Sequence, residues 1–128
     1  MDGDTIKKKK ILIVEDDYSS KLYLNKVLER IGATLLNASD GKEALDVFNA
    51  NPDIDIILMD IQLPVLDGYT CTKMIRESGR SVVIIAQTAY GFSDDRDRML
   101  SSGFNDYLIK PISQKLLIDK ISFYLLNN

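Results

Sequence analysis

Short apolar runs alternate with amphipathic stretches along most of the chain. Residues 11–14 form a continuous apolar run, and residues 54–59 are apolar at all but one position. Such runs are typical of strands buried on both faces of a sheet. Residues 82–86 predict a further all-apolar strand, residues 107–109 predict the last strand, and the more polar residues 34–38 predict an edge strand.

Between these runs, apolar residues recur at intervals of three and four, which predicts five helices. We expect the first to end at Gly32 and the second to be capped by Ser39 or Asp40 and stopped by Pro52. The fourth, near Ser93, has few apolar anchors and should be the least firmly held. The apolar positions of the five helices are, in order, Leu24, Val27, Leu28 and Ile31; Ala44, Leu45 and Phe48; Cys71, Met74 and Ile75; Met99 and Leu100; Leu117, Ile121, Tyr124 and Leu125.

Five strands alternating with five helices predict an α/β fold, in which helices cover both faces of a doubly wound five-stranded parallel sheet. Right-handed crossovers make 2-1-3-4-5 the simplest strand order. Residues 1–9, polar and rich in lysine, are interpreted as a leader or linker, and residues 10–128 as one domain. Ligands of such sheets bind beyond the carboxyl ends of the strands.

Composition narrows the functional classes. A net charge of −3 argues against a nucleic-acid surface. No apolar run approaches the roughly 20 residues needed to span a bilayer, and the single cysteine, Cys71, cannot form an internal disulfide, so we expect a cytoplasmic domain without membrane contact. The chain has no histidine, which excludes Ser-His-Asp and Cys-His catalysis and His-ligated zinc. It also cannot act as a histidine phosphodonor.

The predicted strand ends carry the candidate chemistry. Glu15 and Asp16 follow the first strand, Asp60 the third, Thr88 the fourth and Lys110 the fifth. Clustered carboxylates repel each other unless a proton or a cation lies among them. One lysine does not balance three acids, whereas Mg²⁺ prefers oxygen ligands of this kind. A cation, an ammonium and a hydroxyl around Asp60 predict phosphoryl transfer to that carboxylate.

Each of these residues also has a plainer interpretation. Asp17, next to the acidic pair, precedes a helix and is better explained as its N-cap than as a ligand. Thr88 could simply end a strand, Asp60 could lie in a turn, and Lys110 could be an ordinary surface lysine in extended backbone before proline. It is their coincidence at one edge of the sheet that favours a functional site.

Four motifs resemble those of response-regulator receiver domains of two-component signalling. They are ILIVEDD at 11–17, LMDIQLPVLDG at 58–68, QTA at 87–89 and GFNDYLIKP at 103–111. Their order and spacing match those of the family. Their sequences are most similar to the motifs of receiver domains fused to hybrid histidine kinases. The resemblance implies the flavodoxin-like receiver fold.

The resemblance implies roles for the acidic residues. Asp60 would be the phosphoacceptor and a metal ligand, with Mg²⁺ as the cofactor and Mn²⁺ as an alternative. Asp16 would bind the metal directly, Glu15 largely through water, and Gln62 through its backbone carbonyl. Thr88 would be the switch hydroxyl that turns toward the phosphoryl group.

The same resemblance assigns the remaining positions. Lys110 would contact a phosphoryl oxygen, and its bond to Pro111 would be cis. Tyr107 would be the aromatic rotamer switch. Pro64 and Gly68 would shape the loop after Asp60.

The function implied is that of a phosphoacceptor switch rather than a turnover enzyme. A histidine kinase or a histidine phosphotransfer protein would supply the phosphoryl group, and the surface of the fourth helix, fifth strand and fifth helix would change. The sequence leaves open whether a homodimer forms through that surface, and whether the chain is a stand-alone regulator or a piece of a hybrid histidine kinase.

Ile118 and Phe123 are either exposed on the last helix or packed in the core. We also ask whether Tyr90, two residues after Thr88, shields the acyl phosphate from water or merely packs on the surface.

Two alternatives come from other classes. A metal-dependent phosphatase that forms an aspartyl phosphate would carry a second aspartate two residues after Asp60, where this chain has Gln62. A flavodoxin-like cofactor binder would need a phosphate loop rich in Ser, Thr and Gly after the first strand, where residues 15–17 are acidic. Both alternatives are therefore disfavoured.

Overall fold

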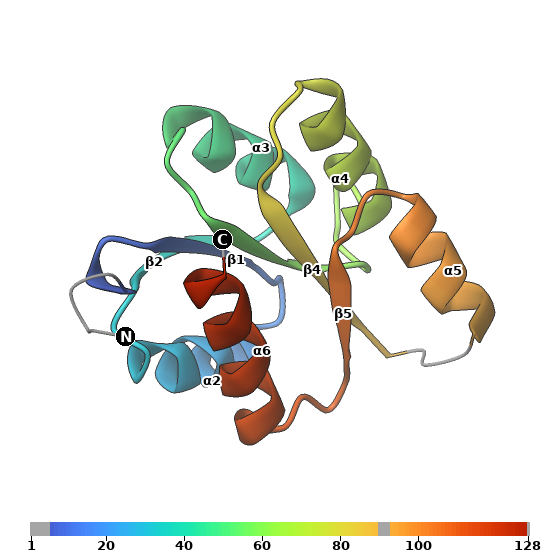
Figure 1. Cartoon of the computed structure of the whole chain (residues 1–128). Coiled ribbons are helices and arrows are strands. Elements are labelled where there is room, and N and C mark those ends of the chain that lie inside the picture. The colour runs from blue at the N-terminus through green and yellow to red at the C-terminus, as the bar shows by residue number, and fades with distance from the viewer. Residues whose placement is uncertain (1–5, 90–92, 128) are drawn as a thin grey trace.

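The computed structural model describes residues 6–89 and 93–127. Within these residues a single sheet has five parallel strands in the order β2-β1-β3-β4-β5, which confirms the predicted fold (Figure 1). The strands are β1 (Lys10–Val14), β2 (Thr34–Ala38), β3 (Ile56–Asp60), β4 (Val83–Thr88) and β5 (Asp106–Ile109).

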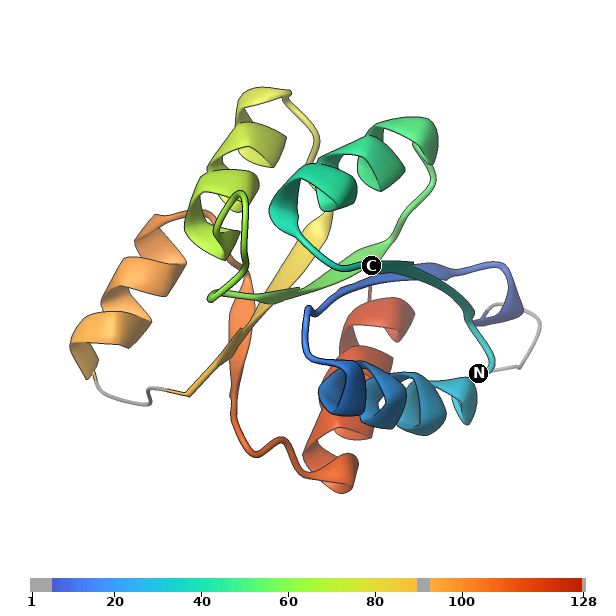
Figure 2. The same ribbon diagram turned by 180° about the vertical axis from the view of Figure 1, so that it is seen from behind.

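Helices cover both faces of this sheet. One pair, α2 and α6, lies on one face, and α3, α4 and α5 lie on the other, as the two opposite views show (Figures 1 and 2). None of the described helices is long and apolar enough to cross a bilayer. Their bounds are α2 (Tyr18–Glu29), α3 (Gly41–Ala50), α4 (Gly68–Glu77), α5 (Ser93–Ser101) and α6 (Gln114–Leu126).

The alternation of side chains along the strands divides the core in two. In β1, Ile11 and Ile13 pack toward α2 and α6, while Leu12 and Val14 pack toward α3 and α4. All four are fully buried, as expected of a central strand covered on both faces. The polar strand β2 lies at the edge, as predicted.

Side-chain caps fix where the helices begin, and therefore how the loops after the strands are shaped. Asp17 accepts a hydrogen bond of 2.8 Å from the backbone N–H of Ser20, which confirms its interpretation as an N-cap. Asp40, Asp67 and Ser113 cap α3, α4 and α6 in the same way.

Two local predictions need correction. β4 runs to Thr88 rather than ending at residue 86, so Gln87 and Thr88 are buried strand residues. Met74, expected on the buried face of α4, is 44% exposed. The buried face of α4 instead includes Cys71, Thr72 and Ile75. These three residues lie on one side of the helix, and Met74 lies next to that side, toward solvent.

Residues 6–9, directly before β1, contact the domain, although the sequence predicted a solvated leader there. Ile6 is 8% exposed and belongs to the core beneath α2 and α6. Lys9 lies 3.8 Å from Asp55, and Lys10 lies 2.9 Å from Asp53. The domain boundary at residue 10 stays a prediction, but Ile6 is buried by the domain that follows it.

Candidate functional site

Three carboxylates meet at the carboxyl edge of the sheet. One oxygen each from Glu15, Asp16 and Asp60 lies within 4.8 Å of the others. Glu15 and Asp16 follow β1, and Asp60 ends the neighbouring strand β3, whose residue Met59 pairs with Val14. Glu15 and Asp60 are almost fully buried, whereas Asp16 is exposed. The predicted cluster is therefore present.

An ammonium group lies against this cluster. Lys110 follows β5, and its Nζ lies 2.8 Å from Oδ2 of Asp60 and 3.5 Å from Oε1 of Glu15. Because β5 is separated from β3 by β4, the long side chain spans the end of β4 to reach Asp60. The Lys110–Pro111 peptide bond is cis, as the resemblance implied.

The electrostatics of the cluster show an excess of negative charge. Burial raises the pKa of Glu15 to about 7, and the charge of Asp60 adds to this effect, although the backbone N–H of Asp17 opposes it. Burial lowers the pKa of Lys110, but the hydrogen bond and charge of Asp60 outweigh it, so the net shift is upward. Because one ammonium faces three carboxylates, these oxygen donors fit a hard divalent cation such as Mg²⁺.

The loop after β3 holds Asp60 in a fixed position. Its Oδ1 accepts a hydrogen bond of 3.0 Å from the backbone N–H of Gln62, while Oδ2 faces Lys110. The backbone N–H of Gly68 donates to the carbonyl oxygen of Ile61 at 2.9 Å. A Cβ at Gly68 would collide with the carbonyl oxygen of Asp60 and lie 2.8 Å from Cα of Ile61. Only glycine allows this close approach.

The two predicted switch residues lie on the neighbouring strands β4 and β5, where Thr88 pairs with Ile109 and Tyr107 with Ala86. Thr88 is 4% exposed at the end of β4, and Tyr107 is half-buried against the core that α3, α4 and α5 cover. The backbone carbonyl of Tyr107 accepts a hydrogen bond of 3.0 Å from Lys120 of α6. Tyr90 lies outside the described residues, so its suggested shielding role stays a hypothesis.

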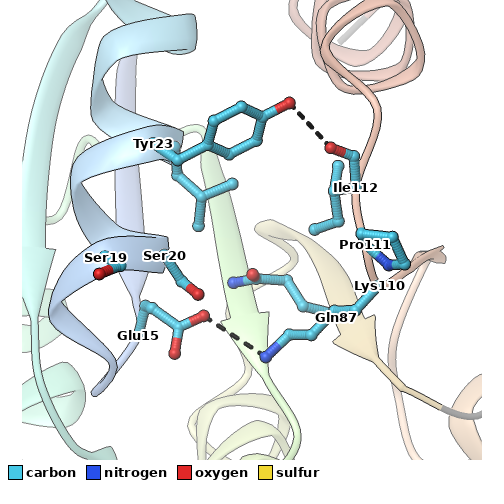
Figure 3. A pocket seen from close by; sticks show the side chains of 9 residues that line it. Glu15, Ser19, Ser20, Tyr23, Gln87, Lys110, Pro111 and Ile112 are labelled. Carbon is cyan, nitrogen blue, oxygen red and sulfur yellow. Dashed lines mark hydrogen bonds and ion pairs between the residues drawn. The ribbon is translucent and has the colours of Figure 1, made fainter.

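Gln87 also belongs to the site, although the sequence points to it only as part of the QTA motif. The residue is 1% exposed and lines a pocket of about 700 Å³ beside Glu15 and Lys110 (Figure 3). An amide directly after the apolar run 82–86 was the available signal. Of the two apolar residues in question on the last helix, Phe123 is 58% exposed, whereas Ile118 packs against the core.

The chain is similar to proteins of two-component signalling. It is 37% identical over 128 residues to hybrid signal transduction histidine kinase I of Dictyostelium discoideum, covering 94% of this chain but 7% of that protein. It is 40% identical to the probable transcriptional regulator ycf27 of Guillardia theta, covering 94% of this chain and 47% of that protein. The chain therefore spans less than half the length of these two relatives. Two-component response regulator 24 of Arabidopsis thaliana is 33% identical, with 88% of this chain and 84% of that protein covered.

Solved structures with the same fold are also similar in sequence. The receiver domain of the Francisella response regulator 1452 superimposes with a TM-score of 0.89 at 31% identity, covering 94% of this chain and 98% of that one. The receiver domain of the sensor histidine kinase PA1611 of Pseudomonas aeruginosa, solved with a magnesium ion in its active site cleft, gives 0.83 at 38% identity, covering 92% and 98%. A family model for the response regulator receiver domain matches residues 11–122. On this match, and with the acidic cluster at the predicted edge of the sheet, the chain belongs to the response regulator receiver domain family.

Proposed function

We propose that this receiver domain accepts a phosphoryl group on Asp60 from a phosphohistidine of a partner, in a Mg²⁺-dependent reaction in the cytoplasm. The observation that carries the proposal is the 2.8 Å contact between Lys110 and Asp60 within a cluster of three carboxylates. Since the relatives include both hybrid kinases and a response regulator of similar length, the donor is a histidine kinase or a histidine phosphotransfer domain.

The chemistry follows from the geometry around Asp60. A carboxylate oxygen of Asp60 attacks phosphorus, the new O–P bond forms, and the N–P bond to the partner's histidine breaks. The imidazole leaves with the electron pair of that bond. Phosphoryl transfer needs positioning and neutralisation of the charge on the equatorial oxygens more than it needs acid–base chemistry. The N–H of Gln62 orients the nucleophile, and Lys110 supplies positive charge beside it.

The carboxylate cluster supports a place for the cation. Asp16 and Asp60 would hold Mg²⁺ directly, Glu15 through water, and Gln62 through its carbonyl oxygen, with Mn²⁺ as an alternative. When bound, the cation neutralises charge on the carboxylates and on the transferred group. The cleft magnesium of the PA1611 receiver domain supports this assignment.

The proposed output is a change in the surface formed by α5, β5 and α6. Thr88 would turn toward the phosphoryl group, and Tyr107 would follow it inward. Phosphorylation then shifts a population between two forms, because the phosphoryl group interacts better with one of them. Homodimer formation through this surface stays a prediction; the exposed Phe123 on α6 supplies apolar area for it.

Intact-mass measurement tests the proposal. Incubation with Mg²⁺ and acetyl phosphate or phosphoramidate should add one phosphoryl group to the native chain and none to Asp60→Asn. Asp16→Asn should be labelled much more slowly. The control Asp119→Asn, which alters an exposed carboxylate paired with Lys115 on α6, should be labelled like the native chain.

Two results would contradict the proposal. Full labelling of Asp60→Asn would place the phosphoryl group elsewhere. Hydrolysis of a generic phosphoester well beyond one equivalent would favour the phosphatase alternative over a switch.

A further inference from the structure

A pocket of about 700 Å³ lies between α2 and the segment that follows β5 (Figure 3). Ser19, Ser20 and Tyr23 of α2 form one side, and Pro111 and Ile112 form the other. The hydroxyl of Tyr23 donates to the carbonyl oxygen of Ile112 at 2.8 Å and joins the two sides. This volume lies within the range of roughly 300–1,000 Å³ that is typical of small-molecule sites, and it exceeds the volume of any one side chain.

The carboxamide of Gln87 reaches into this pocket from β4. Its Nε2 lies 3.5 Å from the carbonyl oxygens of both Val14 and Leu58. Since both neighbours are acceptors, the nitrogen must face them, and this fixes the orientation of the amide. Oε1 is buried and has no hydrogen-bond partner within the described part of the chain.

A buried acceptor of this kind is unfavourable unless a donor reaches it. The rest of the lining is mostly apolar, apart from the hydroxyls of Ser19 and Ser20 and the two charged groups at one side. Those charged groups, Glu15 and Lys110, lie 3.5 Å apart and pair with each other. The lining therefore offers an uncharged ligand an apolar surface and an acceptor. It offers an anionic ligand no free cation, because Lys110 also lies 2.8 Å from Asp60.

We propose that this pocket binds a small uncharged molecule with an apolar body and an N–H or O–H group that donates to Oε1 of Gln87. Glu15 and Lys110 line the pocket and also contact the Asp60 cluster. An occupant would therefore touch two groups that set the environment of Asp60. The site goes beyond the proposed phosphoacceptor function, and its occupation needs no phosphorylation.

Amide-resolved NMR titration of the whole chain tests the proposal with matched probes. Benzamide, phenol and aniline carry a donor, whereas N,N-dimethylbenzamide, anisole and N,N-dimethylaniline do not. We expect at least one donor probe to shift the resonances of Ser19, Ser20 and the Gln87 side chain. It should bind roughly ten-fold more tightly than its donor-free counterpart, which corresponds to one hydrogen bond.

A pair of variants locates the donor contact. Gln87→Met keeps the length of the side chain but removes the acceptor, so it should abolish the preference for donor probes. Gln114→Met, at an exposed position of α6, should retain that preference.

Several outcomes would overturn the proposal. The proposal would be overturned if the native chain bound both members of every probe pair with equal affinity. This result does not depend on whether Gln87→Met folds. Absence of probe-induced shifts at the pocket would show that only water fills it. Shifts there on adding a histidine phosphotransfer domain, with no response to any probe, would assign the pocket to a partner's side chain instead.

Discussion

Val65 has a backbone conformation that a β-branched residue rarely adopts. Its φ is +68°, and the backbone N–H of Leu66 donates to the carbonyl oxygen of Pro64 at 2.7 Å, closing a three-residue turn. The side chain is 78% exposed, so few contacts offset the crowding of its Cβ against the backbone.

Val65→Asn should therefore stabilise the protein by about 1 kcal/mol, since asparagine tolerates positive φ far better than valine. Urea unfolding followed by circular dichroism measures this change. Val65→Ala, which keeps a Cβ, should gain much less. A variant Val65→Asn no more stable than the alanine variant would show that the turn relaxes without cost.

Gly68 and Gly79 differ in what a methyl group would meet. At Gly68 it would meet the backbone of Asp60 and Ile61, whereas at Gly79, where φ is +86°, it has open space around it. Gly68→Ala should destabilise the protein by about 2 kcal/mol through overpacking and slow labelling of Asp60, because the carbonyl that must move belongs to that residue. Gly79→Ala should lose stability but keep the labelling rate. Equal labelling rates in both variants would argue against a role for this contact in placing Asp60.

Individual site residues could be predicted from the sequence only where a general rule placed them. These residues lie at the carboxyl ends of strands, and parallel strands bring those ends to one edge of the sheet. Asp60 is the last residue of β3, and Glu15, Asp16 and Lys110 directly follow β1 and β5. Gln87 was missed because its importance depends on a pocket that two distant segments form. No periodicity reveals such a pocket.

At the scale of elements, α6 is tied to β5 through Asp106. Its Oδ1 accepts from Lys120 at 2.9 Å, and its Oδ2 accepts from the hydroxyl of Tyr124 at 3.0 Å. Lys120 also donates to the carbonyl of Tyr107. These contacts connect the last helix to the strand that carries the proposed aromatic switch.

The alkaline stability of the protein should report the Tyr124 contact. Burial, aided by the hydrogen bond to Asp106, raises the pKa of Tyr124 from 10 to about 12. Between pH 10 and pH 12 the Tyr124 phenol keeps its proton in the folded state but has lost it in the unfolded state, so unfolding releases a proton. The contribution of this phenol to the free energy of unfolding is complete below pH 10 and is lost as pH rises toward 12.

Tyr124→Phe should be less stable than the native chain by about 1 kcal/mol at pH 8, and the difference should shrink between pH 10 and 12. Denaturant unfolding at a series of pH values measures it. Tyr18→Phe, at a 76% exposed position of α2, should change the free energy of unfolding little at pH 8. If the stability difference between the native chain and Tyr124→Phe did not change with pH, the phenol proton of Tyr124 would not be linked to folding.

The type and order of the elements followed from periodicity, but some of their limits did not. β4 extends through Gln87 and Thr88 because both pair with neighbouring strands, Gln87 with Asp60 and Thr88 with Ile109. Both side chains are polar and interrupt the apolar run, although threonine is itself common in strands, so tertiary pairing decides where the strand ends. For the same reason, the burial of Ile6 depends on a core built by later segments.

On the scale of the whole molecule, folding assembles a cluster of like charges that the unfolded chain keeps apart. Glu15 and Asp16 reach Asp60 only when β1 and β3 pair. Their mutual repulsion and the burial of Glu15 and Asp60 cost free energy that a bound cation would offset. A cation that binds the folded state alone stabilises it by mass action, by about 1.4 kcal/mol at ten times its dissociation constant.

Magnesium should therefore raise the free energy of unfolding of the native chain, and the gain should grow with the logarithm of its concentration. Asp16→Asn removes one carboxylate of the cluster, so it should lose most of this gain, yet in EDTA it should be at least as stable as the native chain because a like charge is gone. Urea unfolding in EDTA and at several Mg²⁺ concentrations measures both effects. Asp17→Asn is the matched control, since asparagine caps a helix as well as aspartate does and Asp17 lies outside the cluster; it should keep the full response. If magnesium stabilised Asp16→Asn and Asp17→Asn equally, the cation would be acting on general surface charge rather than at the strand ends.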